Sequence, residues 1–183
     1  SKMYFLIVIL SLIRLKSCAN VINCRPSYTS IIINNKINKP ISNFCSGDLI
    51  FNEDFDTLDR NVWKLENSMG VGGGSKEFQW YVNDDRNAYT EDGILHIKPT
   101  LTADIYGEEF LYNGHVEIPD CTAAIFDGCN KTADLNNIIN PIRSVRMNTY
   151  NSFSFKYGVL EVRAKAPSGD WLFPALWMNP RYS

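Results

Sequence analysis

The stretch GVLEVRAKAP, residues 158–167, carries the clearest structural pattern in the chain. Its apolar residues alternate one by one with charged residues. A period of two places the apolar side chains on one face of a strand and the charged ones on the other. The stretch therefore predicts a half-buried β-strand. Its apolar face is Leu160, Val162, Ala164 and Ala166, and its charged face is Glu161, Arg163 and Lys165.

Shorter stretches elsewhere repeat this alternation. In GILHIKP, Leu95 and Ile97 share one face, and in FSFKYG, Phe153, Phe155 and Tyr157 do so. Turn-forming residues separate the runs, and no long segment keeps the period of an α-helix. The sequence therefore predicts an all-β fold, a sandwich with jelly-roll connections.

The first residues have the features of a secretory signal. The apolar run YFLIVILSLI follows Met3, is too short to span a bilayer, and is succeeded by small residues that end at Ala19. We predict a signal peptide over residues 1–19 and a secreted, extracellular protein. Arg14 and Lys16 depart from the usual pattern, and a short membrane anchor is the alternative.

Cysteine usage agrees with export. Removal of Cys18 with the signal leaves four cysteines, which allow three connectivities, and none of them has the CxxC spacing of a metal site. The simplest pairing joins Cys24 to Cys45 and Cys121 to Cys129.

The remaining chain divides at residue 48. Residues 20–47 are polar and rich in Asn and Ile without a stable period, which suggests a leader tied by cysteines, and residues 48–183 hold the strand-like runs. Asn130 begins the sequon Asn-Lys-Thr, a glycosylation signal in polar sequence that we expect to form a loop.

Composition excludes several partners. The chain has 18 Lys and Arg against 20 Asp and Glu, a net charge of −2 and no basic run, which argues against nucleic acid. The glycines of GVGGGSKEFQWY lack a following helix and a GK[ST] motif, so they do not indicate a phosphate loop. We predict no cofactor and no metal, and expect the acids Glu53, Asp54 and Asp56 to flank a strand end.

The segment KEFQWYVN combines polar and aromatic side chains. As a strand it places Glu77, Gln79 and Tyr81 on one face and Phe78 and Trp80 on the other. Polar groups beside planar rings suit a sugar, whose hydroxyls need hydrogen bonds and whose C–H faces lie on aromatic rings. A strand with one solvated face fits these residues equally well.

Two further segments offer candidate contacts. Arg146 lies within RSVRMNTYNSFSFKYG, where a single arginine is more often solvated or ion-paired than a ligand contact. In the closing stretch GDWLFPALWMNPRYS, Trp171, Phe173, Ala175 and Trp177 share a face if the strand is regular. That face is either core or a wall on which sugars stack.

Three segments together resemble glycoside hydrolase family 16, in its arthropod β-1,3-glucanase and β-1,3-glucan-binding branch. They are FNEDFDTLDRNVWKLE, KEFQWYVNDDRNAYTEDGILHIKPTLT and NPIRSVRMNTYNSFSFKYGVLEVRAKAPSGDWLFPALWMNP, within residues 45–183. The resemblance implies a concanavalin-like jelly roll with a polysaccharide cleft and β-1,3-glucan as partner. It implies that a motif with Phe153, Tyr157 and Gly158 shapes the cleft floor, and that the substrate-binding residues are Glu77, Gln79, Arg146, Trp171, Phe173 and Trp177.

Phe173 and Lys76 depart from the family pattern, and each places one sugar contact in question. The family carries its nucleophile and acid/base on a strand E-x-D-x-x-E beyond WPALWM, and this sequence ends before such a strand. We therefore predict no catalytic residue here and expect a domain that is incomplete at its C-terminus. The expected parent is a secreted endo-β-1,3-glucanase that retains anomeric configuration. The alternative is a non-catalytic β-1,3-glucan-binding receptor of innate immunity.

Overall fold

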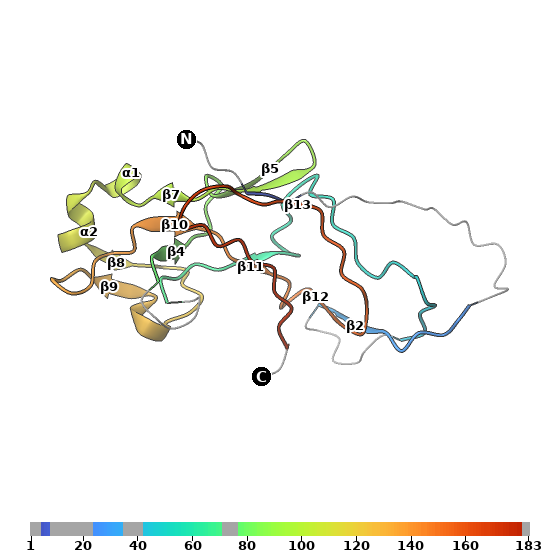
Figure 1. Cartoon of the computed structure of the whole chain (residues 1–183). Coiled ribbons are helices and arrows are strands. Elements are labelled where there is room, and N and C mark those ends of the chain that lie inside the picture. The colour runs from blue at the N-terminus through green and yellow to red at the C-terminus, as the bar shows by residue number, and fades with distance from the viewer. Residues whose placement is uncertain (1–4, 8–23, 35–41, 71–76, 181–183) are drawn as a thin grey trace.

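The structure is a computed structural model that describes residues 5–7, 24–34, 42–70 and 77–180. Strands and loops dominate, and the helices are the single-turn α1 (Ala103–Tyr106), the short α2 (Glu109–Asn113) and the 3-10 turn η1 (Ile125–Asp127). The all-β prediction is confirmed, and no sheet among the described residues closes into a barrel (Figure 1).

The two larger sheets of the described residues have four and three strands (Figure 1). One has the order β13-β1-β6-β5, formed by Ala164–Lys165, Phe5–Ile7, Ile94–Ile97 and Ala88–Glu91. Another has the order β4-β10-β7, formed by Gln79–Tyr81, Ile142–Ser144 and Thr100–Leu101.

Three pairs of strands complete the pairing of the described residues, and each pair is antiparallel. They are β3 (Lys64–Leu65) with β11 (Met147–Asn148), β2 (Ser30–Ile33) with β12 (Phe153–Lys156), and β8 (His115–Glu117) with β9 (Asn130–Thr132).

The main hydrophobic cluster lies between β4, β8 and α2. Trp80 from β4, Val116 from β8 and Leu111 from α2 meet in it, each less than a tenth exposed. Burial of apolar area at about 25 cal/mol per Å² makes this cluster a main source of stability. It also fixes the position of β4, which carries Gln79, one of the predicted substrate-binding residues.

The hairpin of β5 and β6 confirms the alternation seen in the sequence. Leu95 is fully buried, and Asp92 and Gly93 form the two-residue connection with φ of 52° and 69°. Two residues with positive φ are typical of a type I′ turn, whose twist matches that of a hairpin.

The prediction of a half-buried strand over residues 158–167 is wrong for most of that length. Only Ala164–Lys165 pairs, with β1, while Val159 is 88% and Leu160 45% exposed. Alternation buries a face only where a second layer covers it, and the described residues supply no such layer. Tyr157, at φ 65°, leaves the strand direction directly after β12, so it does not continue the face of Phe155.

Residues 20–47 contribute a strand to the fold. β2 pairs with β12 from Ser30 to Ile33, and Ile31 is 5% exposed. The disulfide between Cys24 and Cys45 closes this segment. The described part of the leader therefore packs against the predicted domain.

The second disulfide joins Cys121 to Cys129, so both bonds match the simplest pairing. Asn130 opens β9, opposite Glu117, and does not lie in a loop, because the chain pairs immediately after the disulfide. Its side chain is exposed, and glycosylation there stays a prediction.

Most of the predicted signal peptide, residues 1–4 and 8–19, lies outside the described residues, as do the glycines of residues 71–76. Phe5–Ile7 form β1, between β6 and β13. The described helices are all too short to cross a membrane. The signal peptide therefore stays a prediction.

Candidate functional site

Strand β4 sorts the candidate residues onto two faces. It pairs in parallel with β10, with Trp80 opposite Arg143 and Tyr81 opposite Ser144. Paired residues in a ladder share a face and successive residues alternate. Gln79 and Tyr81 thus lie on one face, and Trp80 and Arg143 lie on the other.

The first face carries a polar cluster, here named the Tyr81 cluster, made of Glu77, Gln79, Tyr81 and Arg146. The Gln79 amide nitrogen donates to the Glu77 carboxylate. The pKa of Tyr81 is raised above its ordinary value, mainly because the side chain is partly buried. The positive charge of Arg146 opposes this shift, and the negative charge of Glu77 adds to it. Because these charges act on one hydroxyl, the four side chains lie close together, as the segment KEFQWYVN predicts for three of them.

A buried amide holds the backbone of this cluster. Asn140, 3% exposed, donates from Nδ2 to the carbonyl oxygens of Glu77 at 2.9 Å and Gln79 at 2.8 Å. Lys131 Nζ donates to Asn140 Oδ1 at 2.7 Å. Sequence reasoning missed Asn140, because its partners lie about sixty residues earlier in the chain and no local pattern marks it.

Among the three predicted aromatic contacts, Trp171 lies beside this region. Its ring stands edge-on to Phe78 at a centroid distance of 6.3 Å, and the two side chains are 90% and 60% exposed. Exposed rings at the start of β4 can meet a ligand without disturbing the core.

The prediction that the aromatic residues of the closing stretch share one face of a strand is wrong. Trp171 has a φ of 63°, Pro174 has no N–H to donate, and residues 166–180 form no strand. Phe173 and Trp177 are 84% and 67% exposed, and within the described residues neither has a ring contact with the Tyr81 cluster.

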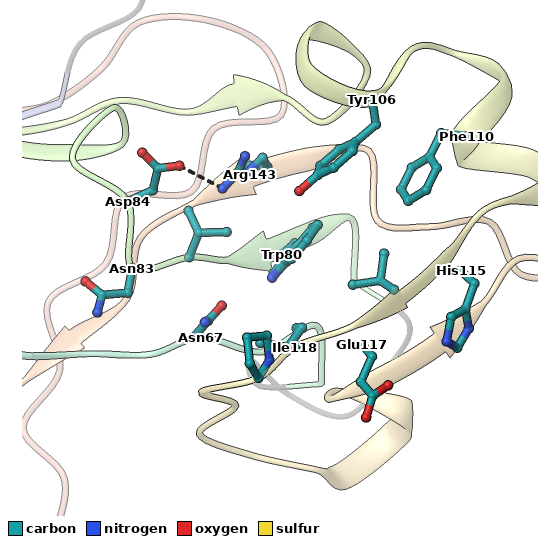
Figure 2. Close-up of a pocket in the computed structure, with 13 residues that line it drawn as sticks. Asn67, Trp80, Asn83, Asp84, Tyr106, Phe110, His115, Glu117, Ile118 and Arg143 are labelled. Carbon is teal, nitrogen blue, oxygen red and sulfur yellow. Dashed lines mark hydrogen bonds and ion pairs between the residues drawn. The ribbon is translucent and has the colours of Figure 1, made fainter.

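The opposite face of β4 lines a cavity of about 330 Å³, here named the back-face pocket. Figure 2 shows Trp80 at its centre, with Tyr106 and Phe110 on one side and Asp84 joined to Arg143. The ring of Tyr106 is stacked on Trp80 at 15° and on Phe110 at 23°. Sequence reasoning named Trp80 as a candidate aromatic contact and assigned Tyr106, Phe110, Asp84 and Arg143 no role.

Arg143 and Asp84 form an ion pair in the back-face pocket. Arg143 Nη2 donates to Asp84 Oδ2 at 2.9 Å, and Arg86 also binds this carboxylate. Hydrogen bonds from Arg86, helped by the charge of Arg143 and opposed by partial burial, lower the pKa of Asp84 from 3.8 to about 2. Asp84 is therefore ionised at neutral pH.

The acids near residue 53 have a structural role. Glu53 accepts the Phe55 backbone N–H at 3.0 Å and the Trp63 indole N–H at 2.7 Å. Over the described ranges, no group of three or more His, Cys, Asp and Glu side chains could hold a metal ion.

The chain is similar to glucan-binding proteins of arthropods. It is 46% identical over 140 residues to a beta-1,3-glucan-binding protein of Penaeus monodon, covering 73% of this chain and 38% of that protein. It is 38% identical over 140 residues to beta-1,3-glucan-binding protein 1 of Galleria mellonella, covering 75% and 28%.

A third relative is Gram-negative bacteria-binding protein 2 of Drosophila melanogaster, 34% identical over 141 residues, covering 74% of this chain and 30% of that protein. The chain thus spans about a third of the length of these relatives. No protein-family model and no solved structure matches it. The resemblance to the glucan-binding branch is confirmed at the level of these relatives, and membership of glycoside hydrolase family 16 stays a prediction.

Proposed function

We propose that the protein binds β-1,3-glucan and acts as a non-catalytic recognition protein of innate immunity. The observation that carries this proposal is its similarity over 140 residues to proteins named for β-1,3-glucan binding in a shrimp and a moth. Because the chain spans a part of these relatives, the proposal concerns the binding surface that this part carries.

The Tyr81 cluster has the chemistry of a sugar contact. A glucan offers hydroxyls that both donate and accept hydrogen bonds. Gln79 can do both, Glu77 accepts and Arg146 donates. The opposite charges of Glu77 and Arg146 offset each other, which suits a neutral polymer. The exposed ring of Trp171, which contacts Phe78 next to Gln79 in the chain, offers a surface for the C–H face of a glucose ring.

Hydrolysis receives less support than binding. The relatives are named for β-1,3-glucan binding, so recognition replaces the endo-β-1,3-glucanase as the first reading. Two disulfides suit an oxidising compartment, and we extend the proposal to a secreted protein.

Co-sedimentation tests this function. The folded full chain should sediment with insoluble β-1,3-glucan and stay in solution with cellulose. Gln79→Ala should sediment less than the wild type, whereas Tyr28→Ala, at a tyrosine that is 92% exposed and outside the Tyr81 cluster, should sediment like the wild type. A folded wild-type chain that does not sediment with β-1,3-glucan refutes the proposal. Release of reducing sugar from laminarin by the folded chain would restore the enzymatic reading.

A further inference from the structure

Two buried donors in the back-face pocket have no hydrogen-bond partner. Trp80 and Arg143 are each 6% exposed, and neither Trp80 Nε1 nor Arg143 Nε is paired. Each unmet buried donor costs about 1 to 3 kcal/mol, and native proteins rarely leave one without a reason. Both residues line the cavity, so a ligand with acceptor oxygens there could satisfy both.

The charge balance selects a neutral ligand. The Arg143 cation is already paired with Asp84, which stays ionised at neutral pH. Glu117, on the opposite wall, adds a further carboxylate. An anion such as phosphate would meet two negative groups and one cation that is already neutralised, so it is disfavoured.

The walls and the size select a sugar ring. Trp80, Tyr106 and Phe110 form a stack whose neighbouring centroids are 6.3 and 4.7 Å apart, and such faces suit the C–H face of a pyranose. A cavity of about 330 Å³ lies at the small end of the range for ligand pockets, which suits one ring better than an oligosaccharide.

Tyr106 lies over Trp80, and both donor atoms are screened from solvent (Figure 2). Tyr106 is 46% exposed on the single-turn helix α1. A ligand reaches the donors only if a covering side chain moves, and an outward movement of Tyr106 costs its stacking on Trp80 and Phe110.

From these observations we propose that the back-face pocket is a second carbohydrate site, which binds one neutral hexopyranose unit. Its acceptor oxygens pair with Trp80 Nε1 and Arg143 Nε, and its C–H face stacks on Tyr106. The site lies on the face of β4 opposite the Tyr81 cluster, so one molecule can hold two sugar chains. Two such sites would raise the avidity for a branched or clustered glucan.

The indole N–H of Trp80 provides a direct probe. In nitrogen–proton correlation spectra of the full chain, the Trp80 signal is the indole signal that Trp80→Phe removes. Methyl β-D-glucopyranoside should shift it saturably, while inorganic phosphate should not. Tyr106→Ala should weaken this binding at least about fivefold, because a stacked ring contributes about 1 kcal/mol or more. Tyr112→Ala, at an exposed tyrosine on α2, is the matched control and should bind like the wild type.

The result separates this site from the Tyr81 cluster. Gln79→Ala should weaken laminarin binding and keep the glucoside-dependent shift of the Trp80 signal. The second site is refuted if the glucoside leaves that signal unmoved, if Tyr106→Ala leaves the affinity unchanged, or if phosphate alone shifts the signal. A preserved shift without any laminarin binding would support the second site and contradict only the proposed function.

Discussion

Arg143 and Trp80 lie opposite each other in the parallel register of β10 and β4, and the guanidinium carbon stands 5.3 Å from the centroid of the indole ring. The same guanidinium binds Asp84, so a buried cation is held by a carboxylate and by an aromatic face. This contact ties two strands that are about sixty residues apart in the chain.

Loss of the buried cation should destabilise the fold. We expect Arg143→Met to lower the free energy of unfolding by about 3 kcal/mol, because it breaks a largely buried ion pair. The control is Arg60→Met, which breaks an ion pair with the 90% exposed Asp85 and should cost about 0 to 1 kcal/mol. Urea unfolding of both variants measures the difference, and equal losses would show that the Arg143 contact adds no stability.

The stability contributed by Asp84 should depend on pH. Its pKa is about 2 in the folded protein against an ordinary value of 3.8, so the folded state favours the ionised form. The contribution is therefore fully present above the ordinary value and is lost as pH falls through the folded value. The stability difference between wild type and Asp84→Asn should be constant near neutral pH and shrink between about pH 4 and pH 2.

Asp85, the exposed neighbour of Asp84 in the chain, supplies the control for the Asp84 variant. Asp85→Asn should change the free energy of unfolding by only about 0 to 1 kcal/mol, because Asp85 is 90% exposed. A difference for Asp84→Asn that grows as the solution is acidified would have the wrong sign and would contradict the assignment.

The Tyr81 cluster predicts the direction in which the Tyr81 pKa is shifted and how two substitutions change that pKa. Tyr81 should ionise above its ordinary pKa of 10.0, Arg146→Met should raise that pKa further, and Glu77→Gln should lower it. Tyrosinate absorbance, taken as the difference between each protein and its Tyr81→Phe counterpart, isolates this residue. If neither charge change moves the titration, the four side chains do not form one cluster.

Both disulfides should be intact in the folded protein. A thiol reagent applied to the denatured, unreduced protein should label none of the four paired cysteines. Loop closure over 8 and 21 residues predicts losses of about 2.5 and about 3 kcal/mol when the Cys121 or Cys24 bond is removed. Labelling of two or more cysteines would argue against the pairing and against export.

Local patterns predicted those parts of the fold whose partners are near in sequence. The hairpin around Asp92 and Gly93 pairs adjacent segments, so alternation and turn residues suffice to define it. The strand predicted over residues 158–167 was wrong because burial of Leu160 requires a second layer of structure over that face, and alternation in the sequence cannot specify one. Sequence therefore indicates which residues can face a core, and tertiary pairing decides whether they do.

The candidate site follows the same rule. Gln79 and Tyr81 share a face because they lie two residues apart on one strand. The support from Asn140 and the register of Trp80 with Arg143 arise from parallel pairing with a distant strand, which leaves no local signal. The back-face pocket is for this reason visible only in the folded chain.

Calorimetric titration of the folded full chain with laminarin tests glucan binding most directly. We expect saturable binding that Gln79→Ala weakens by about 0.5 to 1.5 kcal/mol, the net value of a hydrogen bond. Trp171→Ala should weaken it by roughly 1 to 3 kcal/mol on the scale of aromatic stacking, without loss of the fold, since its side chain is 90% exposed. Tyr28→Ala, at a side chain 92% exposed, should bind like the wild type. A folded wild-type chain that gives no saturable binding, or Gln79 and Trp171 variants that bind as tightly as it does, would contradict the account.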